Sequence, residues 1–106
     1  FSTFALGADG TISGMGSVAA DLQAALFDAV RKGDLAEAQA INDRLRLLAD
    51  VFYSPPFLDQ HNRMKEALVM LGRLRQAVVR PPLQRVSEGE RQRIRTALLR
   101  SGLLPA

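Results

Sequence analysis

One short stretch of this sequence has the pattern of a β-strand, and everything after it has the pattern of α-helices. The run Thr11-Ile12-Ser13 is β-prone and lies between two turn signals, Gly7-Ala8-Asp9-Gly10 and Gly14-Met15-Gly16-Ser17. A single strand has no partner within the chain, and unpaired backbone groups are costly when buried. We therefore expect the rest of its sheet to lie outside these 106 residues.

Helices are predicted on both sides of this run. Residues 1–6 have the pattern of a helix that ends at Gly7. Apolar residues at a spacing of 3.6 predict four more helices, over residues 18–32, 34–52, 57–71 and 87–101. Asp34 and Ser87 are expected N-caps, each with a glutamate three residues later. The expected stops are glycines, which tolerate the left-handed conformation: Gly33, Gly72 and Gly102.

Two further local expectations concern the second half of the chain. The helix over residues 57–71 is expected to bury one apolar face, which consists of Phe57, His61, Met64, Leu68 and Leu71. Residues 73–86 read as irregular, and the paired prolines predict an extended backbone at Arg80-Pro81-Pro82-Leu83.

Composition excludes several classes of protein. At 47% hydrophobic and 24% charged residues, the chain is typical of one globular domain. It has no cysteine, so disulfide frameworks and thiolate metal sites are excluded. No apolar run approaches the ~18 residues of a membrane helix. The chain begins at Phe1 without a targeting signal, and we expect a cytoplasmic piece of a longer protein.

The charge is divided unevenly along the chain. Residues 1–59 carry four basic and eight acidic residues, net −4, whereas residues 60–106 carry ten and three, net +7. This division can indicate a nucleic-acid partner, a solvated face, or a surface that meets an acidic neighbour. Arginines of the last helix would be the phosphate contacts: Arg91, Arg93, Arg95 and Arg100. They spread around the helix with no aromatic residue between them, which disfavours nucleic-acid binding.

The junction between the strand and the next helix is the candidate binding site. A strand that ends in small residues and leads into a helix exposes backbone N–H groups at the positive end of the helix dipole. Such a site suits a carboxylate or a phosphate, and in an α/β barrel it lies on the face that carries the active site. The glycines of residues 14–17 also fit a plain tight turn.

Other catalytic groups are few. His61 is the only histidine, and no paired-histidine metal site or Ser-His-Asp set can be assembled around it. We expect it to be a hydrogen-bonded packing residue. Lys65 could be a desolvated amine nucleophile, but its position between Met64 and Glu66 favours an exposed surface lysine.

The order of the motifs resembles the C-terminal part of the dihydrodipicolinate synthase / N-acetylneuraminate lyase family. The resemblance covers essentially the whole chain. It is carried by five motifs in order: Gly7-Ala8-Asp9-Gly10-Thr11-Ile12-Ser13, Gly33-Asp34, Lys65-Glu66-Ala67-Leu68-Val69-Met70-Leu71-Gly72, Arg80-Pro81-Pro82-Leu83 and Gly102-Leu103-Leu104.

This resemblance implies an α/β fold, a (β/α)₈ TIM barrel of about 250 residues followed by a helical extension. Residues 1–33 would be the end of the barrel, with its last strand and last helix. Residues 34–106 would be the C-terminal helical extension, so the piece itself is mostly α-helical. An isolated piece with an unpaired strand is expected to be marginally stable or to self-associate.

The resemblance also implies the chemistry of a class I lyase or aldolase, in which a lysine amine forms a Schiff base with pyruvate or another 2-oxo acid. The family's catalytic lysine and tyrosine lie before this segment, so neither Lys65 nor Tyr53 is assigned to catalysis and the isolated segment is expected to be inactive. No cofactor or metal is expected. The expected partners are the 2-oxo acid, the rest of the barrel and further copies in a dimer or tetramer, without nucleic acid or membrane.

By the same resemblance, Ser13 and Gly14 correspond to the wall of the substrate pocket at the end of the eighth strand. Gly14 stands where the sialic-acid lyases place a serine, and Ser17 stands where many members have asparagine. Ser17 is still expected to cap the following helix. Two alternatives remain open. One is a small helical interaction module that binds nucleic acid through residues 60–106, and the other is a barrel that binds phosphate at residues 14–17.

Overall fold

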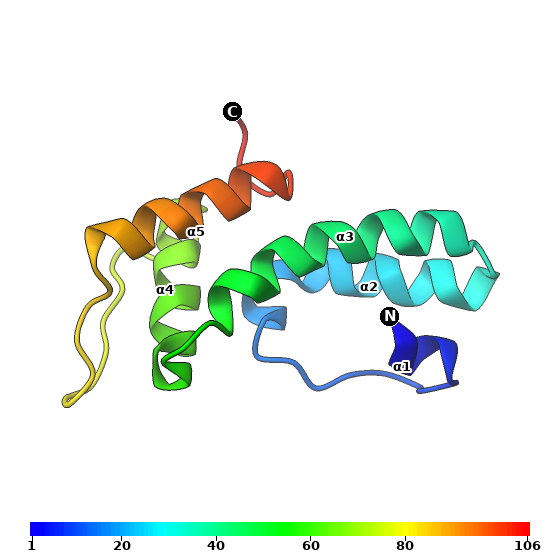
Figure 1. Ribbon diagram of the computed structural model, residues 1–106, viewed down its shortest axis with the longest axis horizontal. Coiled ribbons are helices and arrows are strands. Elements are labelled where there is room, and N and C mark those ends of the chain that lie inside the picture. Colours follow the sequence, from blue (N-terminus) through cyan, green and yellow to red (C-terminus); the bar gives the residue numbers. More distant parts are fainter.

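The computed structural model describes all residues, 1–106, and contains helices but no β-strand. In Figure 1, α2 and α3 run side by side as an antiparallel pair, α4 crosses one end of that pair, and α5 lies across α4. The loop between α4 and α5 extends away from the helices. The elements are α1 (Ser2–Ala5), α2 (Gly16–Lys32), α3 (Leu35–Phe52), the 3₁₀ helix η1 (Phe57–Asp59), α4 (Gln60–Met70) and α5 (Glu88–Arg100). None of these helices is long and apolar enough to cross a bilayer.

The helix ends confirm the predicted caps at Asp34 and Ser87 and the predicted glycine stops. Asp34 Oδ1 accepts a hydrogen bond from the Glu37 amide at 3.0 Å, and Ser87 Oγ accepts one from the Glu90 amide at 3.2 Å. Gly33 has a φ of 76° after α2, a conformation in which a Cβ atom would be strained. Positive φ also occurs at the other predicted stops, Gly7, Gly72 and Gly102.

Removal of the Asp34 cap gives the first testable prediction. Asp34→Ala is expected to lower the free energy of unfolding by about 1 kcal/mol, because the Glu37 amide loses its acceptor. Urea denaturation followed by circular dichroism measures this change. The control is Asp28→Ala, an exposed aspartate on α2, for which we expect a change within about 0.5 kcal/mol. Equal effects of the two substitutions would contradict the capping role.

The core lies where α2, α3, α4 and α5 meet. Its largest fully buried apolar side chains are Phe52 and Leu48 of α3 and Ile94 and Leu98 of α5. At the other end of the α2–α3 pair, α1 packs through Phe4, whose ring meets the Phe27 ring edge-on with centroids 5.2 Å apart. The extension helices therefore share one core with α2, which we expected to be a barrel helix.

The predicted strand does not form in this chain. Residues 11–13 have no strand geometry, and the Ile12 side chain is fully exposed, at 106% of its reference area. A strand is stabilised by hydrogen bonds to a neighbouring strand, and the chain contains none. The expectation of a strand within residues 1–106 is therefore corrected to an irregular segment that leads into α2.

The predicted buried face of residues 57–71 is confirmed at three positions and wrong at two. Met64 is buried, and Leu68 and Leu71 are half-buried against the core. Phe57 is 66% exposed, and His61 is exposed and not the packing residue that the sequence predicts. The helix instead turns Arg63 and Glu66 into the interior, each about 1% exposed. These charged side chains are buried because ion-pair partners come from α5 and the loop before it.

The proline pair after α4 forms a turn instead of the predicted extended run. The Leu83 amide donates to the Arg80 carbonyl at 3.0 Å, which closes a four-residue turn around Pro81 and Pro82. This turn forms the tip of the long loop in Figure 1.

Candidate functional site

The proposed substrate-facing residues, Ser13 and Gly14, lie in the short segment that opens α2. The Ser13 hydroxyl is half-buried and accepts a hydrogen bond from Gln23 Nε2 at 2.8 Å. Gly14 is exposed, and its carbonyl accepts a hydrogen bond from Ser17 Oγ at 2.9 Å. Ser17 is thus not the N-cap of α2, which corrects the sequence prediction; its hydroxyl donates to a carbonyl instead of accepting from an amide.

The backbone amides at this helix start are already occupied. The Gly16 amide donates to the Ser13 carbonyl at 3.1 Å, and the Ser17 amide donates to the Gly14 carbonyl at 3.3 Å. The amides of Val18 and Ala19 both donate to the carbonyl of Met15, at 3.0 Å. A phosphate cradle needs several free amides that point at one anion. This arrangement offers no such cradle, which argues against the phosphate-binding alternative.

The Met15 amide has a distant partner, the hydroxyl of Tyr53, at 3.2 Å. Tyr53 is the C-cap of α3, and 38 residues separate the two groups. A Cβ atom on Gly14 would lie 3.7 Å from both the Tyr53 hydroxyl and Met64 Cε, which is ordinary van der Waals contact. The end of α3 and the middle of α4 therefore form the surroundings of the Gly14 backbone.

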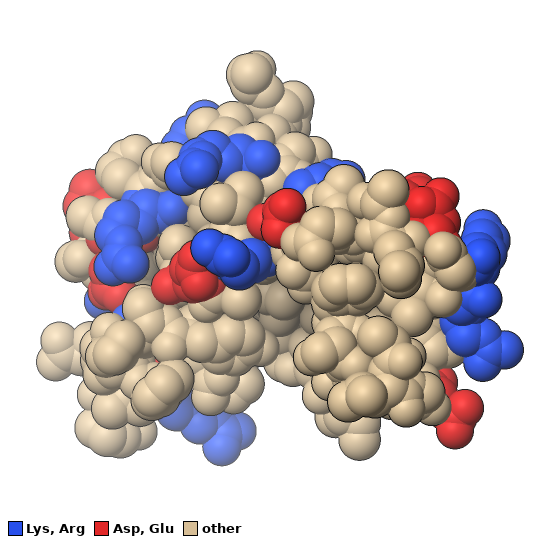
Figure 2. Space-filling model, turned by 45° about the vertical axis from the view of Figure 1, so that its right-hand side comes forward, with Lys and Arg blue, Asp and Glu red and all other residues tan.

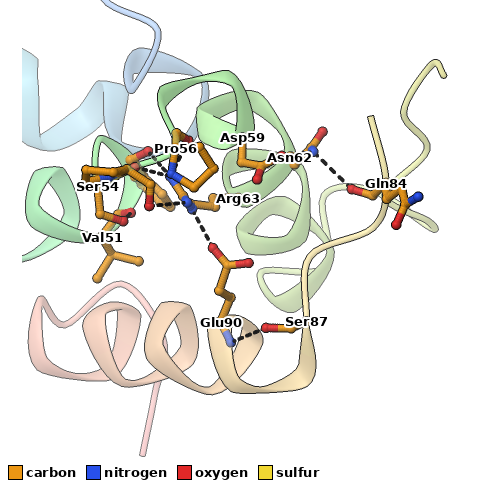
Figure 3. Close-up of polar contacts among 11 residues, drawn as sticks. Val51, Ser54, Pro56, Asp59, Asn62, Arg63, Gln84, Ser87 and Glu90 are labelled. Carbon is orange, nitrogen blue, oxygen red and sulfur yellow. Dashed lines mark hydrogen bonds and ion pairs between the residues drawn. The ribbon is translucent and has the colours of Figure 1, made fainter. Parts of the chain in front are cut away.

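The turn that follows Tyr53 is held by one buried guanidinium, shown in Figure 3. Arg63 of α4 donates to the carbonyls of residues 52, 54, 55 and 56, and its Nε pairs with Glu90 Oε1 at 2.9 Å. All of these partners lie on α3, the following turn or α5. Arg63 therefore fastens three parts of the chain together, and sequence reasoning had given it no role.

A second buried charge lies one turn further along α4. Glu66 Oε1 accepts from Arg85 Nε at 3.0 Å, and Glu66 Oε2 lies 3.5 Å from Arg91 Nε. Asn62 is also buried and donates to the Gln84 carbonyl at 3.1 Å. These contacts fix the loop before α5 against α4, which is a structural role.

The remaining chemical groups are not assembled for catalysis. His61 and Lys65 line one shallow pocket with Ser17, but Lys65 Nζ donates to the Val78 carbonyl at 2.6 Å. Lys65 is half-buried and fastens the loop after α4, so the prediction of a free surface lysine is corrected. No group of three or more histidine, aspartate or glutamate side chains could hold a metal ion.

Several basic residues of the second half make contacts within the chain. Arg63, Arg85 and Arg91 are paired with glutamates, and Arg73 donates to the Val18 carbonyl at 3.0 Å. Figure 2 shows basic and acidic side chains interspersed over the upper part of this face, above a broad uncharged area. Part of the basic charge of the second half is thus paired within the chain.

Comparison with known proteins identifies the family. The Dihydrodipicolinate synthetase family matches residues 1–100, and the chain belongs to this family. The family has a TIM-barrel fold. The chain is 41% identical over 100 residues to the 4-hydroxy-tetrahydrodipicolinate synthase of Rhodopseudomonas palustris strain BisA53, a match that covers 94% of this chain and 32% of that protein.

One further relative has the same name, and another has a different name. The chain is 39% identical over 100 residues to the 4-hydroxy-tetrahydrodipicolinate synthase of Pseudomonas putida strain W619, covering 93% of this chain and 32% of that protein. It is 33% identical over 99 residues to YagE of Escherichia coli K12, covering 92% and 32%. YagE's name provisionally assigns it as a 2-dehydro-3-deoxy-D-gluconate aldolase. The chain thus spans about a third of the length of the curated relatives it matches.

Proposed function

We propose that this chain is the C-terminal part of a class I lyase or aldolase that forms a Schiff base with pyruvate or another 2-oxo acid. Residues 1–33 supply the last strand and last helix of a TIM barrel, and residues 34–106 supply its helical extension. Membership in the Dihydrodipicolinate synthetase family and the synthase and aldolase names of the relatives support this proposal.

The observation that carries the proposal is the unpaired segment before α2. Residues 11–13 have strand propensity and a fully exposed isoleucine, and their only backbone hydrogen bond is the local one from the Gly16 amide to the Ser13 carbonyl. In a closed barrel, the strands on either side would supply the missing hydrogen bonds and cover that side chain. Ser13 and Gly14 would then lie at the carboxyl end of the strand, where barrel enzymes carry their active sites.

In this proposal, the chain contributes to substrate binding, and a lysine elsewhere in the protein forms the covalent bond. The lysine amine attacks the keto carbon of the 2-oxo acid, and water leaves to give a protonated imine. When a carbon–carbon bond is broken, the imine accepts the electron pair of that bond. When a bond is made, the imine loses a proton from C3, and the resulting enamine donates the electron pair to the new carbon–carbon bond. This mechanism requires no metal or organic cofactor. The nucleophile is expected outside residues 1–106, because the resemblance places the family's catalytic lysine on a strand before this segment. Ser13 and Gly14 are small and form one wall of the substrate pocket.

Borohydride trapping tests the proposed function. The full-length protein that contains this chain is incubated with pyruvate, and in a parallel sample with 2-oxobutanoate, before reduction and peptide mass spectrometry. We expect a reduced adduct on one lysine outside residues 1–106, because reduction makes the imine permanent. The absence of an adduct with either acid, or an adduct only on Lys32 or Lys65, would refute the proposal.

The chain of residues 1–106 alone is the matched control. It contains only two lysines, Lys32 in the last turn of α2 and Lys65, whose amine donates to the Val78 carbonyl. We expect no trapped adduct when this chain is treated with pyruvate under the same conditions. A specific adduct on Lys65 would show that the nucleophile belongs to this part of the protein.

A further inference from the structure

The segment that carries Ser13 and Gly14 is fixed from the helical extension by one side-chain hydrogen bond. The Tyr53 hydroxyl accepts the Met15 amide at 3.2 Å, and the peptide that it holds is the one that follows Gly14. The next four amides, those of residues 16–19, are all bonded within the first turn of α2. Among the amides of residues 15–19, the Met15 amide is therefore the one that bonds to a distant part of the chain.

Tyr53 is itself held in place by the extension. Its amide donates to the Ala49 carbonyl at 3.0 Å, as the last turn of α3 requires. On either side of it, the carbonyls of Phe52 and Ser54 accept from the buried Arg63. Arg63 is paired in turn with Glu90 of α5, as Figure 3 shows. A continuous set of contacts thus runs from α5 through α4 to the Tyr53 hydroxyl.

The Tyr53 hydroxyl lies beside Gly14 and close to Met64. A Cβ atom on Gly14 would be 3.7 Å from the hydroxyl oxygen and 3.7 Å from Met64 Cε. The phenol is half-buried, and its ring packs against the edge of the core. The tyrosine ring is rigid and carries a single polar atom, so its hydroxyl fixes the distance between the Gly14–Met15 peptide and the end of α3.

We propose that Tyr53 is a positioning residue, whose hydroxyl holds the Gly14–Met15 peptide and thereby sets the wall of the 2-oxo acid pocket from the helical extension. This inference rests on the proposed function, because the wall has a substrate only if that function holds. Tyr53 does not contact the reacting atoms. It acts through the backbone of the residues that do.

Substitution of Tyr53 by phenylalanine in the full-length protein tests this role. The readout is the pyruvate concentration that gives half-maximal borohydride trapping, together with the maximal trapped fraction. Tyr53→Phe is expected to raise the half-maximal concentration about fivefold, the effect of one lost hydrogen bond. The maximal fraction should stay unchanged, because the lysine is elsewhere. Faster hydrogen exchange of the Met15 amide should accompany the shift.

Ser101→Ala is the matched control, since it removes another hydrogen-bonded hydroxyl far from Gly14. Ser101 Oγ donates to the Leu98 carbonyl at 3.1 Å within α5 and is buried. We expect this variant to lower thermal stability but to leave the pyruvate dependence unchanged. An unshifted Tyr53→Phe, or an equal shift in both variants, would overturn the positioning role. A wild-type protein that traps neither pyruvate nor 2-oxobutanoate would overturn the proposed function, and this inference with it.

Discussion

Replacement of Arg63 by methionine is expected to lower the free energy of unfolding by about 3 to 5 kcal/mol. The arginine side chain is 1% exposed, and its loss leaves Glu90 and the carbonyls of residues 52, 54 and 55 without this donor, whereas the Pro56 carbonyl keeps the Asp59 amide. Methionine fills a similar volume, so the change reports the lost polar contacts more than a cavity. Urea denaturation of the purified protein measures the effect.

Two variants make this prediction specific. Arg63→Lys keeps the positive charge but loses the planar fork that reaches several carbonyls at once, so an intermediate loss is expected. Arg93→Met changes an exposed arginine of α5 and should alter the free energy of unfolding by less than about 0.5 kcal/mol. If Arg63→Met were as mild as Arg93→Met, the fastening role of Arg63 would be wrong.

Replacement of Phe52 by alanine is expected to have a comparable effect, a loss of about 3 to 5 kcal/mol. Phe52 is 1% exposed and belongs to the core where α3 ends. The loss combines the removal of apolar surface from a dry site with the cavity that remains. Thermal and urea unfolding of the same variant should both detect it.

Phe57→Ala is the natural comparison, because it makes the same chemical change five positions later. Phe57 is 66% exposed at the start of η1, and its truncation should change the free energy of unfolding by less than about 0.5 kcal/mol. Equal losses in the two variants would mean that the buried face of this region has been assigned to the wrong residues.

Local signals in the sequence were sufficient for the helices and their ends. Asp34 and Ser87 cap the helices that they were predicted to cap, and Gly33 takes the left-handed conformation predicted after the first long helix. These features depend on residues within one or two turns of each other. Neighbouring residues therefore contain nearly all the information that such predictions need.

The orientation of α4 could not be derived from hydrophobicity alone. The sequence predicts a buried face through His61 and Met64, but of these two only Met64 is buried, and the charged Arg63 and Glu66 are buried as well. Charged side chains are buried only when partners pair with them, and the partner of Arg63 lies 27 residues away on α5. The one sequence pattern that favours the observed orientation is that Arg63, Ala67 and Met70 also lie on one side of the helix.

At the candidate site, too, the sequence predicts features that depend on neighbouring residues but not a contact between distant residues. The sequence indicated the segment before α2 through its glycines and through the family resemblance, whereas the bond between Tyr53 and Met15 spans 38 residues and had no sequence signal. The expected strand at residues 11–13 requires neighbouring strands that this chain lacks.

The most direct test of this account is amide hydrogen exchange at Thr11, Ile12 and Ser13 in the full-length protein, with the chain of residues 1–106 measured beside it. In a barrel these amides pair with neighbouring strands, so we expect slow exchange in the full-length protein and fast exchange in the shorter chain. Fast exchange of all three amides in both proteins would contradict the claim that this segment completes a barrel.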